Sequence, residues 1–224
     1  MTINERIIYN DNRFYNINNN WFPSVTSILK QLNEDGITKW KNRIGKENAD
    51  IIIKKSTERG TKIHLFCELY LKNNYNMPSE INIIDNDIDY FKNTFISYLN
   101  KITNIKLLEG TLYSNKYKYA GTVDCIGEYD NELYIIDFKT SEKPKLLNYI
   151  TSYFLQATAY SIAYEEITGI KIDNILIIIG VNSTMETQIF KENVNNNCKI
   201  YNLSLKDTFI KLLENFNQIN SYPD

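Results

Sequence analysis

The chain has 224 residues, of which 27 are acidic and 25 basic, so its formal net charge is −2, and 43% of its residues are hydrophobic. Such a length and composition are typical of one soluble globular domain with a sizeable core. The near-neutral charge argues against a protein that coats nucleic acid indiscriminately, although it allows a local basic groove. No apolar run approaches the length of a membrane span, so we expect no membrane partner.

The first ten residues, MTINERIIYN, have neither the apolar core of a signal peptide nor the Arg-rich character of a transit peptide. We therefore expect a cytoplasmic protein. Cys67, Cys125 and Cys198 lie far apart and match no disulfide or metal-binding spacing, which indicates buried, reduced thiols. Three cysteines cannot supply the four thiolates of an iron–sulfur cluster, so no such cluster is expected.

The N-terminal part of the chain predicts a short hairpin followed by helices. The hairpin turns at residues 10–12, and Pro23 precedes a helix in SVTSILKQL, residues 24–32. Further helices are expected in residues 37–45, 46–60 and 61–73, the last beginning after Gly60. An amphipathic helix is predicted over residues 86–101, with core residues at helical spacing, namely Ile88, Phe91, Phe95, Tyr98 and Ile102.

The pattern then changes to strands, which are predicted within residues 106–114, 117–129 and 132–140. A long helix over residues 148–168 ends near Gly169, a natural C-terminal cap. NILIIIGV, residues 174–181, is too apolar to alternate and indicates a strand covered on both faces, and METQIF can add another. Ser204 and Asp207 cap the last helix, which buries Phe209, Leu212, Leu213 and Phe216. We therefore expect residues 1–224 to form a single α/β (α+β) domain, with a central mixed β-sheet flanked by helices.

The middle hairpin brings three charged residues together. If Asp130 and Asn131 form a two-residue turn, the two residue numbers of each cross-strand pair add up to 261. Asp124 then stands opposite Asp137 on one face. Strand alternation places Lys139 on that face as well. Two facing carboxylates repel each other, whereas a divalent cation such as Mg²⁺ would bind both, so the spacing predicts a metal site. A slipped register would instead leave three unrelated surface charges.

An acidic residue after a small-residue strand, a hairpin, and then Asp-x-Lys resemble the signature of the PD-(D/E)xK nuclease superfamily. Other motifs are similar to those of its RecB-like exonuclease branch, which includes mitochondrial and phage exonucleases. These are RGTKIHLFCELYL with His64, LQATAYSIAY with Gln156 and Tyr160, and PSVTSIL followed by Trp40. The chain departs from the family pattern where Val123 replaces the nominal proline, where Asp-x-Lys replaces Glu-x-Lys, and where the cluster-binding cysteines of some relatives are missing.

The resemblance implies a restriction-endonuclease-like core in residues 81–224, preceded by a hairpin and helices in residues 1–80 that carry the His motif. It further implies a metal-dependent DNA exonuclease that hydrolyses phosphodiester bonds from DNA ends, with a preference for single-stranded DNA, in replication, recombination or repair. One alternative is a structure-specific or restriction-type endonuclease of the same superfamily. Another is a non-catalytic DNA-binding module.

On this resemblance one or two Mg²⁺ or Mn²⁺ ions would be held by His64, Asp124, Asp137 and the backbone carbonyl of Phe138. The imidazole of His64, the only histidine in the chain, favours Mn²⁺ as well as Mg²⁺. Lys139 would orient the attacking water and help to deprotonate it. Glu109 resembles an acidic position near the metal in relatives, although a surface glutamate is as plausible.

Five further residues are candidates for a role beside the metal site. Gln156 and Tyr160 share one helix face and, by the resemblance, position the substrate strand or Lys139. Glu68, at i+4 from His64, either orients that histidine or is simply solvated. Lys116 and Lys118 alternate with tyrosines in SNKYKYAG and either contact phosphates in a single-strand channel or belong to a solvated edge strand. The basic residues Lys54, Lys55 and Arg59 are expected on a solvated helix face.

Overall fold

The computed structural model describes residues 3–76 and 89–223. Its centre is a five-stranded sheet in the order β4-β5-β6-β7-β8. Neighbouring strands are antiparallel except β6 and β7, which are parallel, so the sheet is mixed as predicted. The strands are β4 (Ile102–Ser114), β5 (Tyr119–Tyr129), β6 (Glu132–Ser141), β7 (Asn174–Val181) and β8 (Glu186–Asn193).

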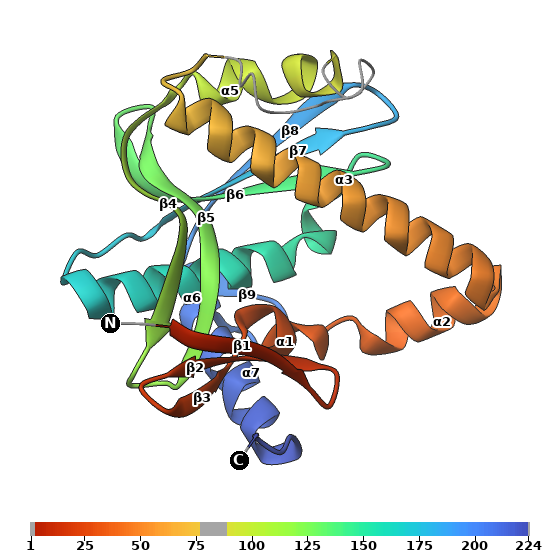
Figure 1. The fold of residues 1–224 in the computed structure, drawn as a ribbon, viewed down its shortest axis with the longest axis vertical. Helices are drawn as coiled ribbons and strands as arrows, with labels where there is room; N and C mark the ends of the chain where they lie inside the picture. Colours follow the sequence, from red (N-terminus) through yellow and green to blue (C-terminus); the bar gives the residue numbers. More distant parts are fainter. Residues whose placement is uncertain (1–2, 77–88, 224) are drawn as a thin grey trace.

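Helices cover both faces of this sheet, as expected of a restriction-endonuclease-like core (Figure 1). One apolar core includes residues of α3 and the alternate strand residues Ile136 and Ile178. The other core includes residues of α6 and α7, with Ile135 and Ile177 from the same two strands. Successive residues of β6 and β7 therefore enter opposite cores, which is why NILIIIGV is apolar throughout. The helices are α3 (Lys46–Lys72), α6 (Thr151–Thr168) and α7 (Leu205–Ile219).

A small N-terminal sheet of order β1-β2-β3 packs against the far end of the β4–β5 hairpin (Figure 1). A bridge between Ser24 and Ala120 joins the two parts. The predicted turn is confirmed at Asn10 and Asp11, which both have positive φ, whereas the third strand was not predicted. The strands are β1 (Ile3–Tyr9), β2 (Asn12–Ile17) and β3 (Asn20–Pro23).

The helices after this sheet follow the prediction with one correction. Ser24 caps α1 (Val25–Lys30) by accepting a hydrogen bond from the N–H of Ser27, and α2 (Glu34–Ile44) follows. The prediction that a helix ends at Gly60 is wrong, because α3 continues through it. Glycine costs a helix only about 1 kcal/mol relative to alanine, and the next residues of α3 bury apolar side chains that offset this cost.

The helix predicted over residues 86–101 lies partly outside the described residues, which resume at Asp89. From there the chain forms a π-helix, η1 (Lys92–Ile96), and a short α5 (Ser97–Leu99), burying Phe91 and Phe95. Ile102 is buried as expected but does not belong to the helix, because it begins β4.

In the last third of the chain, the predicted helix ends are confirmed. Gly169 ends α6 with φ of 74°, and Ser204 caps α7 by accepting from the N–H of Asp207. Short segments complete the chain, namely the 3₁₀ turn η2 (Leu147–Tyr149) and the strands β9 (Asn197–Cys198) and β10 (Leu203–Ser204). The three cysteines are buried and unbonded. Among the described residues, no helix is long and apolar enough to cross a membrane.

The predicted register of the β5–β6 hairpin is confirmed over five pairs, from Tyr129–Glu132 at the turn to Cys125–Ile136. Asp130 and Asn131 have φ of 53° and 65°, the left-handed values of a type I′ turn. The ladder then ends, one step short of Asp124 and Asp137. The expectation that these two carboxylates form the next directly opposed pair is therefore wrong, because the strands separate there.

The β4–β5 hairpin loses its side-chain alternation once in each strand. Leu107 and Leu112 of β4 pack in the same core as α6, although an odd number of positions separates them, and so do Val123 and Ile126 of β5. In a regular strand such residues would lie on opposite faces. Each strand therefore slips by one side chain between these positions, although the ladder keeps one register from Leu107–Ile126 to Ser114–Tyr119 and its register shift lies earlier, between Thr103 and Leu107.

The slip falls at Glu109 and Asp124. The ladder pairs Leu108–Cys125 and Gly110–Val123 flank them, so the two acidic residues lie opposite each other. Glu109 has φ of 47°, a left-handed conformation that is uncommon for a residue other than glycine. Figure 1 shows both strands curving where they leave the sheet. The carboxylates of Glu109 and Asp124 therefore both lie at this bend of the hairpin.

Candidate active site

His64 of α3 lies over the bend in the β4–β5 hairpin. Its Nδ1 atom is 3.2 Å from Oδ1 of Asp124 and 3.6 Å from Oε1 of Glu109. Burial lowers the pKa of His64, but the charge and hydrogen bond of Asp124 and the hydrogen bond of Glu109 outweigh it and raise this pKa from 6.5 to about 10. The metal-free site therefore holds an imidazolium between two carboxylates.

Asp124 is fixed on its other side by the neighbouring strand. Its Oδ2 atom accepts a hydrogen bond of 2.8 Å from the backbone N–H of Phe138, at the point where β5 and β6 separate. Burial raises the pKa of Asp124, but His64 and this hydrogen bond more than compensate, and the net pKa is lowered. The side chain thus replaces the ladder partner that Phe138 has lost on this side, and it remains ionised.

Asp137, which is buried, and Lys139, which is partly buried, form a second pair next to Asp124. The ammonium group of Lys139 is 2.6 Å from Oδ1 and 2.5 Å from Oδ2 of Asp137. Burial raises the pKa of Asp137 from 3.8 to about 6, since the nearby charge of Asp124 adds to it and Lys139 offsets only part. Burial lowers the pKa of Lys139, but Asp137 and Asp124 raise it above its ordinary value. The predicted proximity of these three residues therefore holds even though the ladder ends.

The face of α6 toward this pair carries three polar residues. Nζ of Lys139 is 5.3 Å from the ring centre of Tyr153. Nε2 of Gln156 donates a hydrogen bond of 3.3 Å to the hydroxyl of buried Tyr160. A Cβ atom added to Gly121 would lie 2.8 Å from the ring of Tyr160, so this glycine leaves the space that the ring needs. Tyr153 was not predicted as a site residue, although its helical spacing to Gln156 and Tyr160 was a usable signal.

An ion pair ties the histidine helix to the end of β6. Nη1 of Arg59, one and a half turns before His64, is 2.9 Å from Oε2 of Glu142, which also accepts hydrogen bonds from Asn182. The expectation that Arg59 belongs to a solvated face is wrong, because its side chain is only 21% exposed. Lys54 is exposed, as expected. The sequence carried no signal for this contact, since its partners lie 83 residues apart.

The remaining predicted residues make contacts outside the acidic cluster. Glu68 forms an ion pair with Lys72 on α3, so an orienting contact with His64 stays a prediction. Lys116 and Lys118 lie in the turn between β4 and β5, at the opposite end of the hairpin from the sheet (Figure 1). Their ammonium groups lie 4.8 Å from the ring centre of Tyr117 and 5.3 Å from that of Phe22, respectively.

The donor set fits a hard divalent cation. Ligand atoms of His64, Glu109 and Asp124 all lie within 4.8 Å of one another, and Asp137 adds a buried carboxylate beside them. Like charges that are buried together are costly, and a cation removes this cost. Burial raises the pKa of Cys67 and of Cys125, so these neighbouring thiols remain protonated and are poor ligands.

A mixed five-stranded central sheet flanked by helices is the arrangement of a restriction-endonuclease-like core, and here acidic residues and a lysine lie where two of its strands separate. No family model matches the sequence. Similarity to curated proteins confirms the resemblance to PD-(D/E)xK-type nucleases.

The curated relatives are mitochondrial genome maintenance exonucleases. Mitochondrial genome maintenance exonuclease 1 from Homo sapiens is 31% identical over 156 residues, and the protein of that name from Xenopus tropicalis is 32% identical over 154 residues. Each match covers 63% of this chain and 43% of the relative, so the chain spans less than half the length of the curated relatives it matches. A solved structure titled "Crystal structure of SSO0001" superposes with a TM-score of 0.44 and 16% identity, over 89% of this chain and 77% of the other.

Proposed function

We propose that the protein is a divalent-metal-dependent exonuclease that hydrolyses phosphodiester bonds from DNA ends. The observation that carries the proposal is the junction of two groups: the His64–Glu109–Asp124 cluster and the Asp137–Lys139 pair, which meet where β5 leaves β6. The relatives named as exonucleases support a nuclease role in DNA maintenance. Within that role we infer single-stranded DNA as the preferred substrate, in replication, recombination or repair.

Mg²⁺ or Mn²⁺, as one or two ions, fits the proposed site. His64, Asp124, Asp137 and the carbonyl of Phe138 would hold it, with Glu109 as a further ligand. When bound, such a cation supplies an acidified water and neutralises charge on the phosphate. His64 must release its proton to become a ligand, and Asp137 must ionise.

Hydrolysis forms a bond between a water oxygen and phosphorus, breaks one ester P–O bond, and returns a proton to the leaving oxygen. Lys139 is well placed to orient the water, because Asp137 and Tyr153 hold its ammonium group in the site. Since the pKa of Lys139 is raised, the ion pair favours a role for Lys139 in orientation and charge stabilisation rather than as a base. Gln156 and Tyr160 are inferred to position the strand next to it.

Oligonucleotides labelled at the 5′ or the 3′ end, compared with a covalently closed single-stranded circle, test this function. We expect degradation of the linear strands with Mg²⁺ or Mn²⁺, none with EDTA, and intact circles. Lys139→Ala should lower the rate by a factor on the order of 100 or more, because the water loses its orienting charge. Cleavage of the circles would show an endonuclease instead.

Lys191 provides a matched control for this variant. Its ammonium group also pairs with an aspartate, Asp130, at a distance of 2.8 Å, but at the turn of the β5–β6 hairpin. We expect Lys191→Ala to retain the activity of the wild-type chain. Equal rates for Lys139→Ala and the wild-type chain, with both folded by circular dichroism, would reject the assignment.

A further inference from the structure

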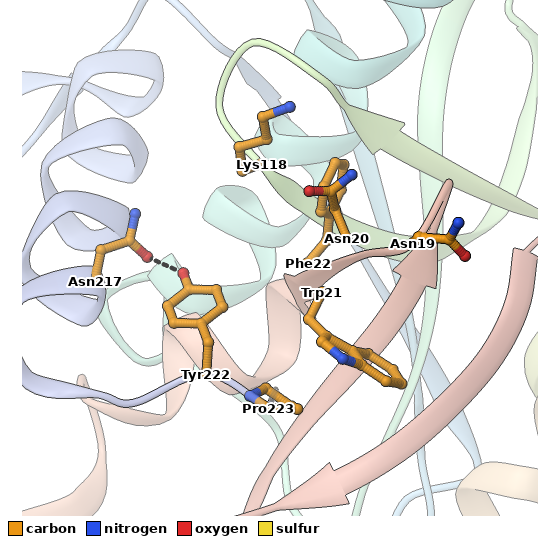
Figure 2. Close-up of a pocket in the computed structure, with 8 residues that line it drawn as sticks. All are labelled: Asn19, Asn20, Trp21, Phe22, Lys118, Asn217, Tyr222 and Pro223. Carbon is orange, nitrogen blue, oxygen red and sulfur yellow. Dashed lines mark hydrogen bonds between the residues drawn. The ribbon is translucent and has the colours of Figure 1, made fainter.

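A cavity of about 560 Å³ lies at the opposite end of the β4–β5 hairpin from the acidic cluster. Its walls come from β3, the β4–β5 turn, the end of α7 and the C-terminal segment (Figure 2). This volume lies within the range of small-ligand sites, which is roughly 300–1,000 Å³. Lys118 lies in the β4–β5 turn, six residues before Asp124, which corresponds to at most about 20 Å at ~3.4 Å per residue.

The side chains of this cavity have the chemistry that binds unpaired nucleotides. Half-buried Trp21 and Tyr222 supply aromatic surface, and Asn20 and Asn217 supply amides that both donate and accept hydrogen bonds, while buried Phe22 packs under Lys118. Lys118 is the cation, and none of the described residues that line the cavity is acidic, although 27 residues of the chain are. Such a wall favours an anion that carries a flat ring.

The walls are held in place by the packing of the chain's end. The hydroxyl of Tyr222 donates a hydrogen bond to Oδ1 of Asn217, and its ring packs edge-on against buried Phe14 at 5.3 Å between centres. Asn12 donates to Asn220, which ties the same segment to β2. Figure 2 shows Phe22 between Lys118 and Trp21. The site is therefore formed without a ligand, which reduces the ordering cost of binding.

We propose that this cavity binds a nucleotide of single-stranded nucleic acid, with a base against Trp21 and a phosphate near Lys118. The inference rests on the proposed nuclease function, because the same strand would continue to the acidic cluster. At the ~3.4 Å rise per nucleotide of one stacked strand, the separation of at most about 20 Å corresponds to no more than roughly six nucleotides. The cavity would then hold the substrate away from the cut and make binding depend on strand length.

The test measures binding in EDTA, where the proposed nuclease is inactive, so that its result does not depend on hydrolysis. The chain has two tryptophans, Trp21 and Trp40, and a Trp40→Phe background leaves Trp21 as the only indole reporter. We expect a 20-nucleotide oligothymidylate to quench the emission of Trp21. Quenching by thymidine monophosphate together with no response to the 20-mer would overturn the assignment to a polymer.

Affinity measurements on variants test the same inference in the otherwise wild-type chain. By anisotropy of labelled 20-mer, we expect Trp21→Ala to weaken binding by about 5- to 150-fold, the effect of one lost stacking contact. A four-nucleotide strand, too short to span the cavity and the acidic cluster, should bind the wild-type chain more weakly than the 20-mer does. An unchanged Kd for the 20-mer would overturn the proposal.

Lys118→Gln keeps the proposal testable if Trp21→Ala fails to fold, because Lys118 is exposed. Lys211 is a matched control, since its ammonium group also lies over a ring, 4.6 Å from the centre of Tyr201. We expect Lys118→Gln to weaken binding of the 20-mer several-fold and Lys211→Gln to leave it unchanged. Equal affinities of these two variants would contradict the proposal. Loss of hydrolysis with Trp21 quenching retained would instead reject only the proposed activity.

Discussion

At the scale of single residues, the site depends on how charges are shared around one imidazole. His64 contacts Asp124 and Glu109, while Lys139 contacts Asp137. In the metal-free protein each of the two cationic groups therefore faces at least one carboxylate. A cation that entered this cluster would replace the proton of His64, so the protonation state of the imidazole reports directly on metal binding.

We predict that His64 titrates with a pKa of about 10 in EDTA and stays neutral at pH 8 when Mg²⁺ is bound. Because this pKa is raised above 6.5, the stability that the imidazolium contributes is present below about pH 6.5 and is lost as the pH rises toward 10. Nuclear magnetic resonance of the imidazole can follow this titration without assignment, since the chain has a single histidine.

The control for this titration is Asp124→Asn. It removes the charge that does most to raise the pKa of His64, while burial continues to lower it. We expect the pKa of His64 to fall in this variant and the response to Mg²⁺ to disappear. An imidazole signal that titrates near its ordinary pKa in the wild-type protein would contradict the geometry of the cluster.

Part of the site was predictable from the sequence at this scale. The spacing around Asp130 and Asn131 fixed the register that brings Asp124 near Asp137, and strand alternation placed Lys139 beside Asp137. The separation of the two strands was not predictable, because it depends on a side chain, Asp124, hydrogen bonding to the backbone of β6. Contacts between distant segments, such as Arg59 with Glu142, leave no local pattern.

At the scale of elements, α6 and β5 approach each other closely at Gly121. A methyl group at this position would lie 2.8 Å from the ring carbon and 3.0 Å from the hydroxyl oxygen of Tyr160. The ring would have to move, and the hydrogen bond from Gln156 would move with it. The proposed positioning of the substrate by α6 therefore depends on one missing side chain in β5.

We predict that Gly121→Ala lowers the free energy of unfolding by about 1–3 kcal/mol, the usual cost of overpacking. Its hydrolysis rate should fall by a factor on the order of 10 to 100, because α6 is displaced from the site. The control is Gly60→Ala in α3, where an added Cβ meets nothing within 4 Å. That variant should gain about 0.5–1 kcal/mol and keep its activity. Chemical denaturation and the oligonucleotide assay measure both effects, and similar losses in the two variants would contradict this account.

The order and type of most elements followed from periodicity and caps. Gly169 and Ser204 marked helix ends that the structure confirms. β3 was missed because its four residues, Asn20–Pro23, are too few to show a period. The slip at Glu109 and Asp124 was also invisible, since alternation can be read only where residues differ clearly in polarity, and this hairpin is largely apolar on both faces.

At the scale of the whole molecule, the metal-free protein carries unfavourable charge in its centre. Asp137 is 1% exposed, and its pKa of about 6 lies above the ordinary 3.8. Between these two values the folded protein binds more protons than the unfolded chain, so this group makes the fold less stable as the pH rises from about 4 to 6. A cation binds the ionised form and therefore competes with the proton.

We predict that Mg²⁺ or Mn²⁺ raises the Tm only slightly at pH 5 and more at pH 8, because Asp137 and His64 must both lose a proton to bind it. At 100 times its Kd a cation that binds only the folded state adds about 2.7 kcal/mol. Differential scanning calorimetry with matched EDTA samples measures the shift, and Asp137→Asn should abolish most of it. A shift of equal size at pH 5 and pH 8 would contradict a role for Asp137 as ligand.

The bend at Glu109 also interrupts the free edge of the central sheet. β4 is an edge strand of 13 residues, and a long, flat edge is a template on which another chain can add a strand and start aggregation. The left-handed residue Glu109 breaks the regular row of backbone donors and acceptors near the middle of that edge. The conformation that brings a carboxylate to His64 therefore also blunts the exposed side of the sheet, so that a straighter β4 would cost solubility as well as the site.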